Sequence, residues 1–147
     1  MFSILRIEGD PTAWYVDPPV TAGQLTAGSP VALPLASPLA GRLLLSPRAV
    51  GSVAVMDPGP GHGVIPSGAQ LPEPCLYLPS PAGAGGQPRY PLPPLTDLAA
   101  LESQIMAAMG AGSFVTVELT AVADTGVLVL NGAALSFAVL CPASPKG

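Results

Sequence analysis

Proline and glycine recur along almost the whole chain and limit the length of the helices and strands that it can form. The 147 residues include 20 Pro and 17 Gly, which separate short apolar runs instead of gathering in long polar tracts. Because proline has no backbone N–H and disfavours the helical conformation in the residue before it, long helices are excluded from most of the chain. Short apolar runs bounded by proline and glycine are typical of many short β-strands joined by tight turns.

Six short segments before residue 80 have the apolar or alternating character of strands. These segments are residues 3–7, 14–16, 30–35, 39–45, 52–56 and 76–78. Pro34 lies inside the third segment, and because proline cannot donate a ladder hydrogen bond we expect that segment at a sheet edge or at a bend. Two stretches rich in proline and glycine, 57–74 and 79–94, are expected to form surface loops or arms.

One amphipathic helix is predicted over about residues 96–109. Thr96 and Asp97 offer an N-cap and an acidic residue in the first turn. The apolar residues that follow at helical spacing are Leu98, Leu101, Ile105, Ala108 and Met109. Gly110 and Gly112 then end the helix, as glycines at helix C-termini do.

The segment after the helix has the pattern of antiparallel strands. Val115, Val117 and Leu119 alternate with polar residues, which predicts a strand with one buried face. Asn131-Gly132 separates two further apolar runs and predicts a hairpin with a type I′ turn. We therefore expect a three-stranded meander over about 113–141, with the helix packed on its apolar face. The predicted fold class is α+β, mainly β, in a single domain of residues 1–147.

The low content of charge limits the partners that the chain can have. Charged residues make up 10% of the chain, against about 25% in an average soluble domain. The net charge is −4 and the five basic side chains are scattered, so neither nucleic acid nor a membrane is predicted as a partner. A surface so poor in charge is covered by small polar residues or hidden against another chain, and we favour self-association or binding to another protein.

The predicted location is the cytoplasm, or a particle assembled there. The N-terminal residues have no apolar segment of signal-peptide length, and the most apolar stretch, 119–141, is interrupted by Asp124 and by glycines. In composition the chain resembles the small decoration and connector proteins of viral particles. That likeness rests on no residue-level motif.

Few residues in the chain are suited to catalysis. His62 is the only histidine, and with Asp57 and Ser67 in the same glycine-rich loop it is the centre of an alternative hypothesis, a small hydrolase or ligand-binding enzyme. No G-x-S-x-G elbow accompanies these residues, so we expect no catalytic site. Cys75 and Cys141 lie far apart in the sequence and are interpreted as small apolar residues at strand ends.

No metal site and no cofactor site is predicted. One histidine and two distant cysteines provide no ligand cluster, and no glycine run precedes a helix in the way that phosphate-binding motifs require. A small-molecule pocket beneath the helix stays open as a further alternative, because its residues would be indistinguishable from core.

Four residues are candidates for a protein interface: Trp14, Tyr15, Arg89 and Tyr90. Aromatic and arginine side chains contribute disproportionately to binding between proteins, and both pairs lie beside prolines. The alternative for Trp14 is that it packs at the edge of the core. The sequence as a whole predicts a non-enzymatic structural or interaction module that forms part of a homo-oligomer or a larger assembly.

Overall fold

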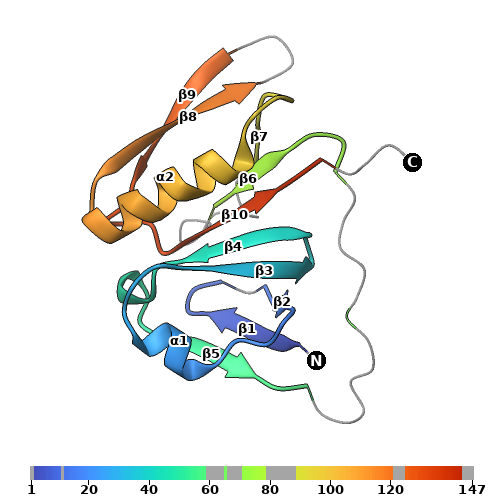
Figure 1. The fold of residues 1–147 in the computed structure, drawn as a ribbon, viewed down its shortest axis with the longest axis vertical. Helices are drawn as coiled ribbons and strands as arrows, with labels where there is room; N and C mark the ends of the chain where they lie inside the picture. The colour runs from blue at the N-terminus through green and yellow to red at the C-terminus, as the bar shows by residue number, and fades with distance from the viewer. Residues whose placement is uncertain are drawn as a thin grey trace.

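The computed structural model describes residues 2–10, 12–58, 65, 71–78, 89–120 and 125–143. Within these residues the chain forms an eight-stranded antiparallel sheet, a separate two-stranded ribbon and one long helix (Figure 1). This arrangement confirms the predicted α+β, mainly β fold class.

The eight-stranded sheet has the order β5-β1-β2-β3-β4-β10-β6-β7. Its strands, in chain order, are β1 Ser3–Ile7, β2 Trp14–Val16, β3 Val31–Ser37, β4 Gly41–Leu45, β5 Val53–Met56, β6 Cys75–Tyr77, β7 Arg89–Pro91 and β10 Phe137–Cys141. The six segments predicted from the first part of the sequence correspond to β1 through β6. Proline and glycine between the runs thus separate strands, as expected.

The sheet is strongly curled. In a flat sheet, β2 and β6 would lie about 19 Å apart, because neighbouring strands are spaced by about 4.8 Å. The ring centroids of Trp14 on β2 and Tyr77 on β6 are only 6.0 Å apart, and Trp14 also meets Phe137 of β10 at 5.8 Å. The concave side of the sheet therefore closes around one hydrophobic core, centred on Trp14 and the leucines of β3 and β4.

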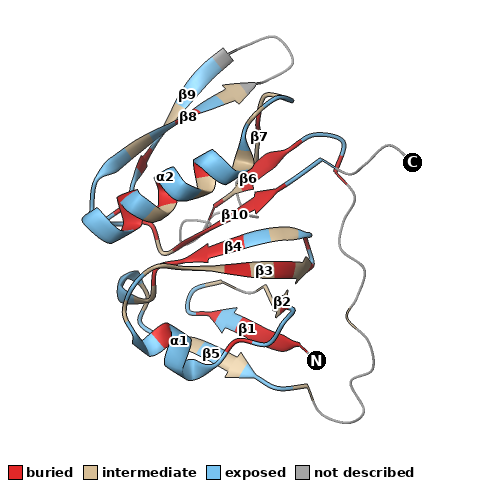
Figure 2. Cartoon of the chain, in the orientation of Figure 1, coloured by how far each residue is buried: buried red, intermediate tan, exposed pale blue. Residues whose placement is uncertain are grey.

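A second core lies on the convex side of the sheet, beneath the helix α2 (Leu98–Ala111) and the ribbon of β8 (Phe114–Thr120) and β9 (Thr125–Asn131). Leu101, Ile105 and Met109 of the helix meet Val117 of β8 and Leu140 of β10 in this core. Figure 2 shows the buried face of α2 turned toward the sheet and its other side exposed.

The strand β10 departs from the predicted three-stranded meander. It pairs with β4 and β6 in the large sheet, whereas β8 and β9 pair only with each other. All five residues of β10 are buried: Phe137, Val139 and Cys141 face the first core, and Ala138 and Leu140 face the second. In the predicted meander only one face of this strand would be covered, and its other apolar face would be exposed to solvent. A strand that is apolar on both faces is therefore more stable between two cores.

The turn after β9 also differs from the prediction. Ala134 N–H donates to Asn131 O and Ala133 N–H donates to Asn131 Oδ1, each at 3.1 Å. Neither Asn131 nor Gly132 has positive φ, so the turn is not type I′. Glycine is required at 132 for a different reason: a Cβ there would overlap the carbonyl group of Ala108 near the end of α2.

The helix α2 begins and ends close to the predicted residues. Asp97 is its N-cap, and its Oδ1 accepts from Ala100 N at 3.1 Å. The neighbouring Thr96 instead donates from Oγ1 to Pro93 O at 2.7 Å. At the other end Gly112 adopts φ 69°, a left-handed conformation that suits glycine, whereas Gly110 lies inside the helix.

A short helix, α1 (Ala22–Thr26), was not predicted. Gln24 Oε1 accepts from Thr21 N at 2.8 Å, half of a capping box whose Thr-x-x-Gln pattern is readable in the sequence. Pro34, expected at an edge or bend, lies in β3 between two neighbours. The carbonyl oxygen of Pro34 accepts a hydrogen bond from Asp17 N, and Asp17 is the residue that follows the end of β2. The N–H that proline lacks would therefore point past the end of that short strand.

The predicted loops are only partly within the described residues. The end of the first loop is anchored, because Leu71 is buried in the first core. The predicted arm 79–94 is corrected at Arg89–Pro91, which form the edge strand β7 paired with β6. Residues 79–88 lie outside the described residues.

Candidate interaction surface

The structure places the four predicted interface residues in different environments. Trp14 is fully buried, and its Nε1 donates to Asp10 Oδ2 at 2.7 Å, so it serves the core. Tyr15 is half-buried with its ring centroid 5.8 Å from that of Phe2. Arg89 is exposed on β7, and the half-buried Tyr90 packs against the second core. Because Trp14 is buried, it offers no surface to a partner. Tyr15 packs beside Phe2 and Tyr90 packs against the second core, so these two residues lie in different parts of the molecule.

The alternative catalytic loop is only partly described. Asp57 is exposed just after β5, whereas His62 and Ser67 lie outside the described residues. The hydrolase hypothesis therefore stays a prediction without a geometry. Among the described residues, no three histidine, cysteine or acidic side chains come close enough to share a metal ion.

The two cysteines are neighbours in space. Cys75 and Cys141 are direct partners across β6 and β10, both are buried, and both are free thiols. Their mutual hydrogen bond, together with burial, raises the pKa of Cys141 above its ordinary value, and the same bond lowers the pKa of Cys75. They occupy strand ends as predicted, but no pattern in the sequence indicated that they would face each other.

The outer face of the β8–β9 ribbon carries large apolar side chains in contact with solvent. Phe114 is 68% exposed, Val127 62% and Val129 60%. The register pairs Thr116 with Val129 and Glu118 with Val127, so all of these side chains share one face with Phe114. We call Phe114, Val127 and Val129 the ribbon face. Glu118 is its only charged neighbour among the described residues of the ribbon.

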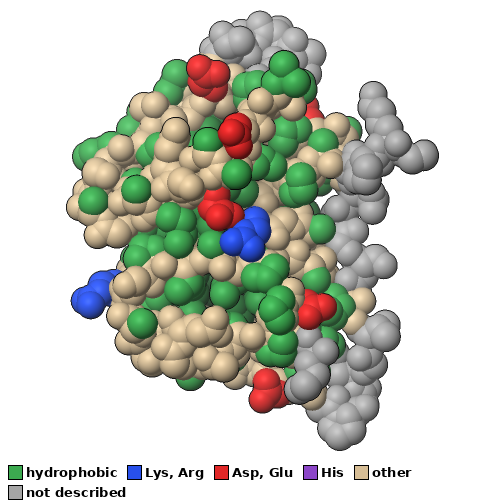
Figure 3. Space-filling view, viewed as in Figure 1, with side chains coloured by type: hydrophobic (Ala, Val, Ile, Leu, Met, Phe, Trp, Pro, Cys, Tyr) green, Lys and Arg blue, Asp and Glu red, His purple; other side chains and the backbone are tan. Residues whose placement is uncertain are grey.

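The outer strand of the ribbon lacks the features that protect edge strands. β9 contains no charged residue and no proline, and its register with β8 runs through all seven positions without a bulge. Apart from β8, no described element makes more than slight contact with β9. Long, uncharged, apolar edges of this kind pair readily with other chains. Figure 3 likewise shows few charged side chains on the face it presents.

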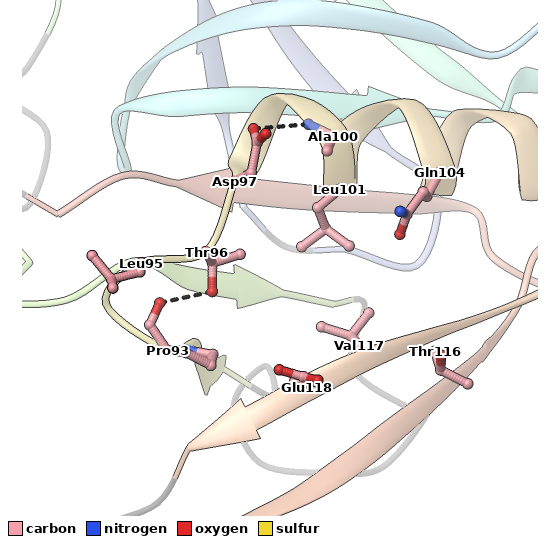
Figure 4. Close-up of a pocket in the computed structure, with 10 residues that line it drawn as sticks. All are labelled: Pro93, Leu95, Thr96, Asp97, Ala100, Leu101, Gln104, Thr116, Val117 and Glu118. Carbon is pink, nitrogen blue, oxygen red and sulfur yellow. Dashed lines mark hydrogen bonds between the residues drawn. The ribbon is translucent and has the colours of Figure 1, made fainter.

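A groove separates the N-terminal half of α2 from β8 (Figure 4). Its volume is about 480 Å³, and its walls include Ala100, Leu101 and Gln104 from the helix. The opposite wall is formed by three consecutive residues of β8, Thr116 to Glu118. Leu101 and Val117 point toward one another from the two sides (Figure 4).

A second hollow, of about 440 Å³, lies on the other side of α2, where Ala99 and Leu98 face Leu140. It contains both partners of the ion pair between Arg42 Nε and Glu102 Oε1, which are 2.8 Å apart. Because these two charged groups already satisfy each other, this hollow offers a ligand little beyond apolar contact.

Comparison with known proteins leaves the chain without a relative. No family model, curated protein or solved structure matches it. The described residues also include no helix with the length and apolar character needed to span a membrane. The ribbon face and the groove are the features of the described residues that bear on function.

The sequence contains a weak signal for the ribbon face. Residues 127–130 are Val-Leu-Val-Leu, an apolar run without alternation. Such a run gives a strand apolar side chains on both faces. Only the structure shows that Leu130 is buried in the second core while Val127 and Val129 face outward.

Proposed function

We propose that this protein is a non-enzymatic structural module that self-associates by packing the ribbon faces of two copies against each other. The observation that carries the proposal is the exposure of Phe114, Val127 and Val129, each more than half open to solvent on one face. Contiguous exposed apolar side chains on a charge-poor protein mark surfaces that are covered in the functional state.

A second copy of the same chain suits this surface. Glu118 is the only charged residue beside the ribbon face among the described residues of the ribbon, so two copies bring no row of like charges together. Two identical patches related by a two-fold axis form a closed interface. Pairing of two β9 edges would leave Val127 and Val129 in water, so packing of the faces is the arrangement that buries them.

The patch is smaller than a complete dimer interface, which buries about 1,200–2,000 Å² in total. Burying the exposed parts of Phe114, Val127 and Val129 on both copies removes about 400–600 Å² of apolar surface from water, worth about 10–15 kcal/mol. Association costs about 4–15 kcal/mol. Because the two ranges overlap, the patch would form the apolar centre of a larger interface, and one charged side chain within it should be disruptive.

We place this module in the cytoplasm or in a particle assembled there. Two free, buried thiols side by side are compatible with a reducing compartment. The open edge of β9 would also allow a dimer to join a larger assembly, which accords with the composition of the chain.

Light scattering coupled to size-exclusion chromatography tests the proposal. The wild-type chain of 14.6 kDa should approach twice that mass as its concentration rises. Val129→Lys removes a side chain that is 60% exposed on each copy, which costs the dimer at least about 2 kcal/mol and weakens it about thirtyfold.

Met56→Lys is the matched control. Met56 is 36% exposed on the edge strand β5 of the large sheet, far from the ribbon in the strand order, so the same substitution there should leave self-association unchanged. A wild-type chain that remains monomeric at high concentration contradicts the proposal, as does an equal effect of the two substitutions.

A further inference from the structure

We propose that the groove between α2 and β8 binds an extended peptide with a basic side chain, which adds as a third strand to the open edge of β8. This site lies at the edge of the ribbon, where the lining residues Thr116 and Glu118 are on the same side of β8 as the ribbon face. Binding of the peptide requires no second copy of the chain. It gives the protein a second kind of partner, a peptide segment of another protein.

The groove runs along a strand edge. Thr116 and Glu118 project from one face of β8 and Val117 from the other, and all three line the groove, which agrees with a cavity along the edge of the strand. The other edge of β8 is paired with β9, and no described residue of β9 lines the groove. Within the described residues, 114–120 have no backbone hydrogen bond outside the ribbon. The part of this edge that lines the groove, beside α2 and near β7, is where the added strand would pair.

The helix provides a wall for side chains of the added strand. Leu101 and Val117 are 6% and 3% exposed, and they form an apolar floor between helix and strand. A volume of about 480 Å³ falls within the usual range of ligand sites. The three residues of β8 that line the groove span about 10 Å, which corresponds to three or more residues of an extended peptide.

The charges around the groove favour a basic peptide. Among the described residues that line it, only Asp97 and Glu118 are charged. Asp97 caps α2, where the positive end of the helix dipole offsets its charge. Glu118 is exposed on the outer face of β8 and has no ion pair among the described residues. An alternating peptide would place apolar side chains on the floor and its intervening lysine or arginine beside Glu118.

Fluorescence anisotropy with defined peptides tests the site. The probe is an acetylated, fluorescein-labelled pentapeptide, Val-Lys-Val-Lys-Val, and the comparison peptide replaces both lysines with glutamate. The lysine peptide should bind saturably to the wild-type chain and the glutamate peptide should bind at least about tenfold more weakly, because the groove is acidic.

Backbone methylation distinguishes strand addition from simple charge attraction. Successive residues of an added strand direct their N–H groups alternately toward β8 and toward solvent. Methylation of the central valine nitrogen should therefore differ in its effect from methylation of both lysine nitrogens, with one weakening binding and the other not. An equal effect of the two would overturn the strand-addition geometry.

Two adjacent alanines on α2 supply the blocking variant and its control. Ala100 lines the groove, whereas Ala99 lines the hollow on the other side of the helix, and both are exposed. Ala100→Trp should fill the groove and weaken binding of the lysine peptide by at least about tenfold. Ala99→Trp should leave the affinity for that peptide within about twofold of the wild-type value. Glu118→Gln should weaken the lysine peptide and leave the glutamate peptide unimpaired.

Light scattering of the same samples keeps this proposal separate from self-association. Ala100→Trp should not change the oligomeric state of the protein, and Val129→Lys should not abolish peptide binding. Absence of saturable binding by the lysine peptide, or equal binding to the Ala100→Trp and wild-type chains, would overturn the proposed peptide site and leave the dimer untouched.

Discussion

Gly132 offers the sharpest test of how the ribbon is attached to the helix. Its backbone passes so close to the end of α2 that an added Cβ would meet the carbonyl carbon and oxygen of Ala108 and the nitrogen of Met109. These are backbone atoms of a helix and cannot move aside cheaply. Gly132→Ala must therefore displace the turn, and with it the hydrogen bond of 2.8 Å from Gly132 N to Ser113 O.

The expected cost follows from these two effects. Forcing a methyl group into packed surroundings costs about 1–3 kcal/mol. Loss of a backbone hydrogen bond adds about 1 kcal/mol. The free energy of unfolding should thus fall by about 2–4 kcal/mol, which for a chain of this size lowers Tm by about 5–15 °C.

Gly126 is the matched control within the same ribbon. It has no neighbouring atom within 4 Å of an added Cβ, and its φ is not positive. Gly126→Ala should therefore be neutral or stabilise the fold by up to about 1 kcal/mol, through the lower entropy of the unfolded chain.

Urea unfolding followed by tryptophan fluorescence measures both variants, because the single tryptophan, Trp14, is fully buried. Dilute protein keeps self-association out of the measurement. If Gly132→Ala proves as mild as Gly126→Ala, the close approach of the turn to the helix is not what requires glycine at position 132.

Two further predictions concern α2 and the paired thiols. Asp97→Ala should lower the unfolding free energy by about 1 kcal/mol, because it removes the acceptor for Ala100 N, whereas Asp97→Asn should restore most of it in the same urea assay. In the folded protein the raised pKa of Cys141 keeps that thiol protonated, so its alkylation by iodoacetamide, followed by mass spectrometry, should not accelerate between about pH 7 and 9 as a free thiol with a pKa near 8.5 would. Rapid alkylation of Cys141 in native protein would contradict the buried thiol pair, and unfolding in urea provides the positive control.

Local signals in the sequence were sufficient for α2 and β8. An aspartate before the apolar spacing and a glycine after it define the helix ends through hydrogen bonds between near neighbours. The alternation of Val115, Val117 and Leu119 with polar residues likewise predicted which face of β8 is turned inward, and Val117 is indeed buried. These features depend on residues close together in the chain.

The candidate sites depended on contacts that no local pattern contains. Tyr15 and Tyr90 stay predicted interface residues, and the structure shows both half-buried against other side chains. The ribbon face escaped prediction because the run at 127–130 is apolar on both sides. The groove requires α2 and β8 to lie side by side, which only their packing on a shared core brings about.

The sequence by itself determined where the chain is interrupted and which short runs become strands, because backbone restrictions of proline and glycine act on immediate neighbours. Only the tertiary structure decided the strand partners. The strand Phe137–Cys141 pairs with β4 and β6 and not with β9, because the two cores bury both of its faces. The same packing explains why glycine is required at position 132. The requirement comes from the close approach of Gly132 to Ala108 of the helix, a residue distant in sequence, and not from a tight hairpin turn.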